Sequence, residues 1–126
     1  MRKDKRLTDV ELELMMILWR IGEGSVNDVI AQLPKGRELA YTSVSTMLRI
    51  LEQKEALSTR KEGRGHVYIP MLKKAEYETA IIKHMVENVF DGTPMALVTQ
   101  LIGSVKMEAS EVEQLKQLLD QMTKKK

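Results

Sequence analysis

Residues 41–51, YTSVSTMLRIL, combine apolar side chains at helical spacing with small hydroxyl side chains on the opposite side. The apolar members are Val44, Met47, Leu48 and Leu51. An exposed helix face is ordinarily rich in Lys, Glu and Gln, whereas Ser and Thr are poorer helix formers. The stretch therefore predicts a helix whose hydroxyl-rich face serves a purpose other than helix stability.

A basic hairpin is predicted directly after this helix. Residues 57–70, LSTRKEGRGHVYIP, have β-type side chains on both sides of the break EGRG. The break places Arg64 between two glycines, and Pro70 ends the second strand. This pattern is typical of two antiparallel strands joined by a flexible, positively charged tip.

Two helices are predicted before residue 40. Thr8 stands three residues before Glu11, the spacing of a capping box, and Gly22 follows the apolar stripe of this first helix. Ser25 can cap a second, shorter helix through Asp28. Three helices and a hairpin, in this order, are typical of a winged helix-turn-helix domain.

The predicted fold assigns DNA-binding roles to the middle of the chain. The third helix, at about residues 40–54, would enter the major groove, and the wing, at about residues 57–70, would lie along the DNA backbone. Residues 34–74 contain nine Lys/Arg and four Asp/Glu, a net charge of +5, although the whole chain has a formal net charge of only +2. Such a basic segment is expected of a nucleic-acid-binding face.

The chain returns to helical patterns from residue 73. Three amphipathic segments follow, the last with Ser110 and Glu113 at the spacing of a capping box. So few residues cannot bury these apolar stripes alone, so the stripes pack either on the first domain or on a second copy. A protein that binds a two-fold symmetric DNA site needs a second copy of itself, which favours a symmetric homodimer. The expected dimer contacts are Tyr77, Ile81, Met85, Val89, Leu97, Leu101, Val112, Leu115, Leu118 and Leu119.

The sequence thus predicts a mainly α fold with a small β-hairpin. A winged helix-turn-helix DNA-binding domain at residues 1–72 would precede an α-helical dimerisation domain at residues 73–126.

Other functional classes have little support in the composition. The chain has no cysteine, and we find no nucleophile–base pair, paired carboxylates or metal-ligand cluster, so we expect no enzyme, metal site or cofactor. The sequence indicates no known small-molecule ligand, and it leaves open the signal that would release the protein from DNA. No apolar run approaches the roughly 18 residues of a membrane span, and the basic start is followed by acids, which predicts a cytoplasmic protein without a signal peptide.

Three stretches carry a family resemblance. Residues 7–19 (LTDVELELMMILW), 41–54 (YTSVSTMLRILEQK) and 60–70 (RKEGRGHVYIP) resemble, in order and in register, the penicillinase-repressor family of bacterial winged-helix regulators. The resemblance implies a homodimeric, sequence-specific transcriptional repressor that binds double-stranded DNA at a palindromic operator.

The resemblance also implies which side chains face DNA. On the third helix these are Thr42, Ser43, Ser45, Thr46 and Arg49, and at the wing tip Arg64. Serine and threonine hydroxyls donate to phosphates and base edges. Arg49 would bind a guanine or a phosphate, and Arg64 the minor groove or a phosphate.

Three further side chains are candidate contacts to the DNA backbone. Tyr41 either donates to a phosphate or packs on the second helix. Arg60 and Lys61 lie on the first wing strand, where strand alternation turns only one of them toward DNA.

The sequence departs from the family pattern at three points. Glu55 replaces a glycine that ends the third helix in a left-handed turn in many members, which leaves the exit geometry open. Gln100–Leu101 stands where antibiotic-responsive members have a cleavable Asn-Phe bond, so release by the same protease is not expected. The cysteine pairs of copper-responsive members are also missing.

A different class of function, a winged-helix adapter that binds protein instead of DNA, is the alternative. Such modules usually have apolar or acidic residues on the third helix. The segment 42–49 has no acidic residue, which argues against the adapter.

Overall fold

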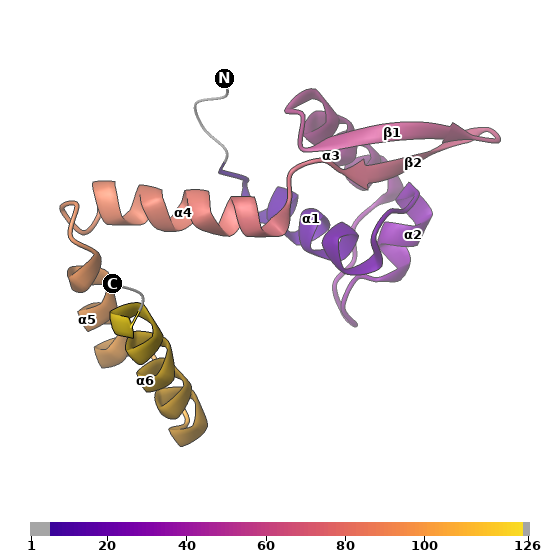
Figure 1. Ribbon diagram of the computed structural model, residues 1–126. Helices are drawn as coiled ribbons and strands as arrows, with labels where there is room; N and C mark the ends of the chain where they lie inside the picture. The colour runs from indigo at the N-terminus through magenta and orange to yellow at the C-terminus, as the bar shows by residue number, and fades with distance from the viewer. Residues whose placement is uncertain (1–5, 125–126) are drawn as a thin grey trace. The chain divides into compact units, whose positions relative to one another are not determined.

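The computed structural model describes residues 6–124 and consists of six helices and one hairpin (Figure 1). In chain order the elements are α1 (Asp9–Ile21), α2 (Val26–Ala31), α3 (Tyr41–Gln53), β1 (Leu57–Glu62), β2 (Gly65–Pro70), α4 (Lys74–Asn88), α5 (Pro94–Ser104) and α6 (Ala109–Lys124). This arrangement confirms the predicted fold class, a winged helix-turn-helix followed by helices.

Both predicted capping boxes at the start of the chain are present. The Glu11 amide donates to Thr8 Oγ1 at 3.2 Å, and the Thr8 amide donates to the Glu11 carboxylate at 2.9 Å. The Asp28 and Ser25 pair repeats this exchange at the start of α2, at 3.1 and 3.0 Å. Gly22, with φ 94°, ends α1 in a conformation that suits glycine.

The exit of α3 keeps the left-handed turn without a glycine. Glu55 itself adopts φ 69°. The Ala56 amide donates to the Leu51 carbonyl, and the Glu55 amide to the Glu52 carbonyl, each at 2.9 Å. These two bonds are those of a Schellman motif. The exit geometry is therefore that of a glycine-terminated helix, with the strain of a left-handed glutamate.

The capping box predicted for the last helix is wrong. Ser110 lies inside α6, which begins at Ala109. Instead, the Glu108 amide donates to the Glu111 carboxylate at 3.3 Å. The error arises because the acid that reaches back is Glu111, three residues after Glu108, and not Glu113.

The hairpin pairs from Leu57 with Pro70 to Glu62 with Gly65, and Gly63 turns the chain with φ 59°. A third segment extends it, because Gly24 and Tyr68 exchange backbone hydrogen bonds at 3.1 and 2.8 Å. The wing is thus joined to the turn between α1 and α2.

The core lies where α1, α2, α3 and the hairpin meet. Its largest fully buried side chains are Leu14, Met15, Leu18, Val29, Val44, Leu48 and Leu51. The apolar face predicted for α3 is therefore its core face. At the edge of this core, the Trp19 indole donates to the Leu72 carbonyl at 2.8 Å.

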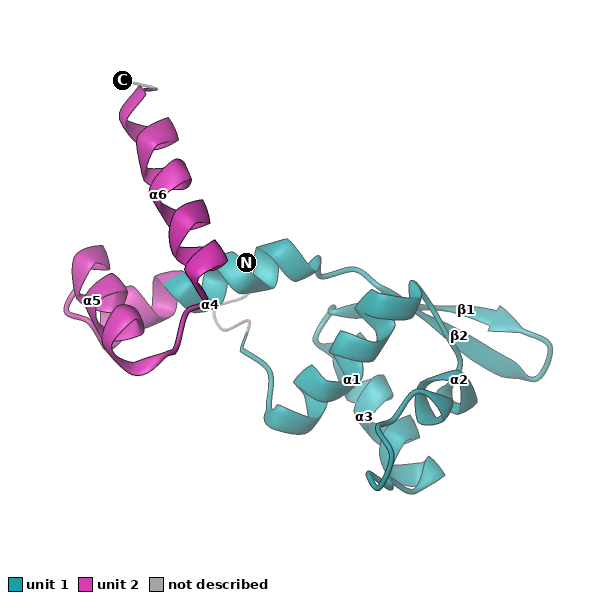
Figure 2. Ribbon diagram, turned by 90° about the horizontal axis from the view of Figure 1, so that it is seen from below, with its two compact units in different colours: residues 1–82 teal, residues 83–126 magenta. Residues whose placement is uncertain are grey.

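Contacts divide the chain into two compact units, residues 1–82 and 83–126 (Figure 2). Tyr77, on the first half of α4, belongs to the first unit. It is buried, its ring centroid lies 6.0 Å from that of Trp19, and its hydroxyl accepts a hydrogen bond from the Leu7 amide at 3.3 Å. The first unit therefore includes part of α4, which the expected domain boundary at residue 72 placed in the second domain. Residues 1–5 and 125–126 of the expected domains lie outside the described residues.

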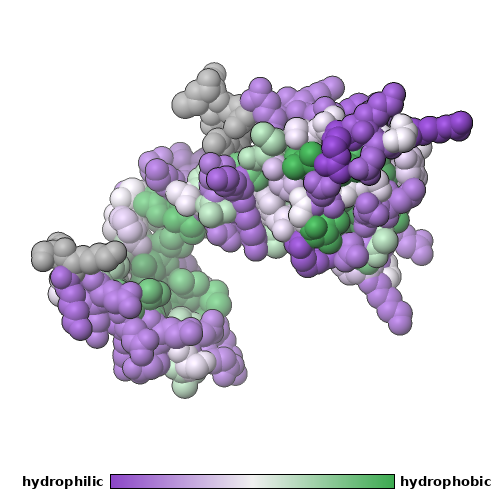
Figure 3. Space-filling view, turned by 45° about the vertical axis from the view of Figure 1, so that its right-hand side comes forward, coloured by the Kyte–Doolittle hydropathy of each residue, from purple (hydrophilic) through white to green (hydrophobic). Residues whose placement is uncertain are grey.

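The second unit has a different character. Neither α5 nor α6 has a buried residue. Figure 3 shows hydrophobic surface gathered over this unit.

Candidate nucleic-acid interface

Helix α3 presents its polar side to solvent. Thr42, Ser43, Thr46 and Arg49 are exposed and Ser45 is half-buried, opposite the core-facing side chains. The N-cap residue Ala40 makes no side-chain cap hydrogen bond, and the first turn has no acidic residue. The amide groups of this turn therefore remain available to an anion.

Arginines near this face divide into two groups. Arg37, in the segment before α3, forms a two-pronged ion pair with Glu13 at 2.9 Å for both bonds. Arg60 on β1 binds Glu23 at 2.7 Å and Glu62 at 3.2 Å. These carboxylates raise the pKa of both guanidinium groups, and Arg37 and Arg60 lower the pKa of Glu13 and Glu23.

The second group is open to a partner. Within residues 6–124, Arg49 and Arg64 form no ion pair, and both are exposed. Lys61 is exposed as well. The predicted contact Arg60 is thus held by acids of its own chain, whereas the predicted contacts Arg49, Arg64 and Lys61 are available.

A polar cavity of about 510 Å³, here called the wing groove, lies between α3 and the wing. Helix α3 contributes Tyr41, Ser45, Arg49 and Glu52; the wing contributes Thr59, Arg64, Gly65, His66 and Tyr68; and the start of α2 contributes Ser25, Val26 and Asn27. The groove thus brings together three predicted contacts from the helix with the wing-tip arginine. It does not include Thr42, Ser43, Thr46, Arg60 or Lys61.

Tyr68 is the most buried polar side chain of the wing groove, with 5% of its surface exposed. Burial raises the pKa of its hydroxyl, the nearby Glu52 carboxylate raises it further, and the Arg49 guanidinium opposes the shift. Glu52 accepts a hydrogen bond from Thr59 at 3.1 Å, which links α3 to β1. The Tyr68 hydroxyl therefore stays protonated at neutral pH as a hydrogen-bond donor in the groove.

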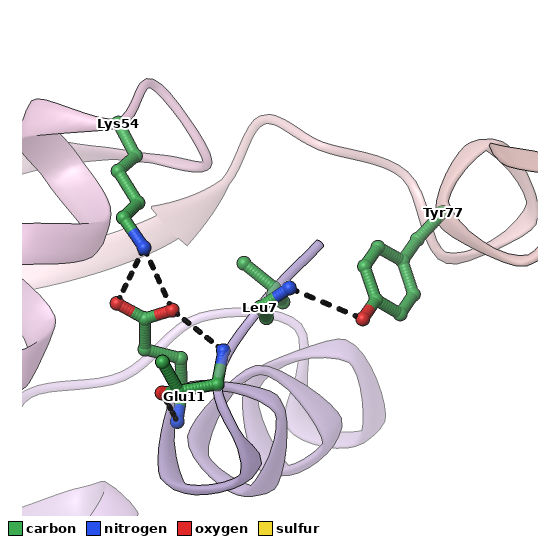
Figure 4. Close-up of polar contacts among 5 residues, drawn as sticks. Leu7, Glu11, Lys54 and Tyr77 are labelled. Atoms are coloured by element: carbon green, nitrogen blue, oxygen red, sulfur yellow. Dashed lines mark hydrogen bonds and ion pairs between the residues drawn. The ribbon is translucent and has the colours of Figure 1, made fainter. Parts of the chain in front are cut away.

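An ion pair between the half-exposed Lys54 and the buried Glu11 holds the C-terminal end of α3 (Figure 4). Lys54 Nζ lies 2.8 and 2.9 Å from the two carboxylate oxygens of Glu11, whose residue is only 2% exposed. Burial raises the pKa of Glu11, but the hydrogen bonds from Lys54 and Thr8 outweigh it, so the net pKa is lowered. The pair joins the first turn of α1 to Lys54, the C-cap residue of α3, and thereby links the two helices at the point where α3 ends.

The predicted dimer contacts fall into two groups. Tyr77 is buried in the first unit, and Ile81 is half-buried against the core of that unit. Met85, Leu97 and Leu115 are half-buried, whereas Val89, Leu101, Val112, Leu118 and Leu119 are exposed.

No group of three or more His, Asp or Glu side chains within residues 6–124 could hold a metal ion. None of the helices described is long and apolar enough to cross a membrane.

With this geometry in place, the sequence profile of the penicillinase repressor family matches residues 7–121. The chain belongs to this family. It is 29% identical to the penicillinase repressor of Bacillus licheniformis over 126 residues, which cover 100% of this chain and 98% of the relative. It is 20% identical to the methicillin resistance regulatory protein MecI of Mammaliicoccus sciuri, over 94% of this chain and 96% of the relative.

Solved structures agree with this membership. Over 61% of its length, the chain is similar to the solution structure of the DNA-binding domain of the repressor BlaI, with 36% identity, a TM-score of 0.52, and coverage of 94% of that structure. It is also similar to monomeric Bacillus licheniformis BlaI in complex with the blaP half-operator, with 36% identity, a TM-score of 0.50, and the same coverage.

Several side chains that line the wing groove are not predicted from the sequence, among them Glu52, His66 and Tyr68. Outside the groove, the sequence predicts only a capping role for Glu11 and not its ion pair with Lys54. For Tyr68 a signal existed, because it follows buried Val67 in a strand whose alternation should have turned one of the two toward the helix. No sequence signal indicates the ion pair between Glu11 and Lys54, because the two residues are distant in the sequence.

Proposed function

We propose that this member of the penicillinase repressor family is a sequence-specific DNA-binding transcriptional repressor that acts as a homodimer on a palindromic operator. Helix α3 would enter the major groove, and the β1–β2 wing would contact the DNA backbone. The observation that carries the proposal is the exposed hydroxyl face of α3 beside Arg49 and Arg64, which form no ion pair within the described residues 6–124. This face has the donors that base edges and phosphates accept.

The domain roles follow from the same arrangement. The winged-helix part, residues 1–72, would bind DNA, and residues 73–126 would dimerise. Exposed large apolar side chains on α5 and α6 support this role for the second domain, because surface of this kind marks protein–protein contacts. The likeness to a BlaI bound to a half-operator supports two half-sites, one for each protomer.

The first experiment is a mobility shift with DNA from upstream of the protein's own gene, at two salt concentrations. We expect a discrete complex that operator DNA displaces and random DNA does not, and that weakens steeply as salt rises. Diffuse binding that salt abolishes on every fragment tested would contradict sequence-specific binding at these sites and favour the adapter function.

A matched pair of substitutions tests the binding face. Ser43→Asp adds a negative charge to the exposed face of α3, whereas Ser110→Asp adds the same charge to α6, where Ser110 is also exposed. We expect the first to abolish operator binding through phosphate repulsion and the second to leave it within about twofold. Equal losses in both variants would contradict the assignment of α3.

A further inference from the structure

The polar residues of α3 divide between two faces. Tyr41, Ser45 and Arg49 are four residues apart, share one stripe of the helix, and line the wing groove. Thr42 and Thr46 lie on the adjacent stripe, outside the groove. The helix therefore has a groove face beside the wing and a separate hydroxyl face.

Donors from different elements converge in the wing groove. Arg49 comes from α3, Arg64 from the hairpin tip, and the buried Tyr68 hydroxyl from β2. Neither arginine forms an ion pair within the part of the chain that the structure describes. Two guanidinium groups that form no ion pair within residues 6–124, beside the Tyr68 hydroxyl, match a phosphate, whose oxygens accept several charge-assisted hydrogen bonds.

We propose that the wing groove is a binding site for one backbone phosphate of DNA, held by Arg49 and Arg64. This proposal rests on the proposed function. It assigns Arg49 to the backbone and leaves base recognition on α3 to the hydroxyl face, Thr42, Ser43 and Thr46. Arg49 Nη2 lies 3.5 Å from Ser45 Oγ, along the groove stripe and not across the hydroxyl face.

Glu52 is the one acidic side chain among the residues that line the groove, and it limits the affinity of the site. Its carboxylate is held by Thr59 at 3.1 Å. A negative charge beside the phosphate opposes binding, while the hydrogen bond to Thr59 fastens helix to wing. Glu52→Gln removes the charge and keeps an oxygen that accepts from Thr59, so we expect this substitution to tighten DNA binding several-fold at low salt.

The decisive comparison uses the full-length protein with operator and random DNA across a range of salt concentrations. Arg49→Ala and Arg64→Ala should each weaken binding to both DNAs by the same factor and lower the salt slope by about one. Arg20→Ala is the matched control, because Arg20 is exposed but binds Gln32 outside the groove. It should leave both quantities unchanged.

Arg49→Lys separates a phosphate contact from a base contact. Lysine keeps the charge but not the planar fork that binds guanine. We expect it to retain most of the wild-type affinity and the full salt slope. A loss as large as that of alanine, confined to operator DNA and relieved by changing one base pair, would assign Arg49 to a base and overturn the proposal.

Neutral methylphosphonate linkages, placed one at a time along the operator, locate the phosphate. A neutral linkage at one position should weaken DNA binding by the wild-type protein. The same linkage should not further weaken DNA binding by the Arg49→Ala or Arg64→Ala variant. If every position weakens the variants as much as the wild-type protein, the groove binds no phosphate. The preference of the wild-type protein for operator over random DNA is measured separately. If that preference is absent, the proposed function is contradicted. If it is present but no linkage position behaves as expected, only the phosphate site is contradicted.

Discussion

The two units of the chain differ in how much apolar surface they bury by themselves. The first unit contains a core in which Leu14, Leu18 and Leu48 are completely buried. The second exposes Leu118 and Leu119 over more than half of their surface and has no buried residue in α5 or α6. Hydrophobic burial is the main favourable term in folding, so we expect the first unit to hold most of the stability of the isolated chain and the second unit to gain stability from the proposed association.

The largest effect should come from the first unit. Leu18→Ala removes a fully buried side chain and leaves a cavity, so we expect the free energy of unfolding to fall by about 2–5 kcal/mol. The measurement is urea denaturation followed by the fluorescence of the single tryptophan, Trp19, which lies in this unit. Leu118→Ala is the control and should change this transition by less than about 0.5 kcal/mol. Similar losses in both would remove the distinction between the units.

The second unit should show its effect in association. Replacing Leu118 and Leu119 together by Ala removes two exposed apolar side chains, and we expect the dimer dissociation constant to rise roughly tenfold or more. Sedimentation equilibrium measures it, with the denaturation of the first unit as a check on folding. An unchanged dissociation constant would contradict the dimer contacts proposed here.

The Glu11–Lys54 pair should respond unequally to loss of either partner. Lys54→Met leaves a buried carboxylate unpaired, so we expect a loss of about 1–3 kcal/mol in unfolding free energy. Glu11→Gln should cost less, because the Lys54 side chain is 44% exposed and its ammonium can turn to water. If Glu11→Gln lowered the free energy of unfolding as much as Lys54→Met or more, burial of Glu11 would not explain the difference between the two variants.

The same pair gives a pH dependence. The folded pKa of Glu11 lies below its ordinary value of 4.5, so its contribution is present above that pH and is lost as the pH falls through the folded pKa. The difference in stability between the wild-type protein and Glu11→Gln should therefore shrink as the pH falls below 4.5 and through the lowered folded pKa. Melting temperatures across this range measure it, and a constant difference would contradict the lowered pKa.

The smallest effect concerns the caps. Thr8→Ala removes the hydroxyl that accepts from the Glu11 amide, and we expect a loss of about 1 kcal/mol. Ser110→Ala is the matched control, because Ser110 is exposed inside α6 and caps nothing. Thermal melting of the two variants checks this difference.

Much of the fold could be predicted because local signals agree with it. The periodic apolar residues of α3, the caps at Thr8 and Ser25, and the glycines around Arg64 each act over a few residues, which sequence spacing reveals. The cap predicted at Ser110 fails because two acids, Glu111 and Glu113, offered competing registers, and spacing alone does not choose between them.

The candidate site was predictable only in part. The hydroxyl side of α3 and the basic wing are visible in the sequence as residue types. The sequence does not reveal which arginines are available to a partner, because Arg60 and Arg37 form ion pairs with glutamates that are distant in the sequence.

By itself, the sequence determined the order of helices and hairpin, the polar face of α3, and the basic middle of the chain, because each depends on residues that are neighbours along the backbone. Only the tertiary structure decided that Glu11 is buried against Lys54, that Tyr68 and Glu52 share a groove with Arg49, and that Arg60 is occupied. These are contacts between elements, and a side chain's charge acts through the distance and burial that folding gives it.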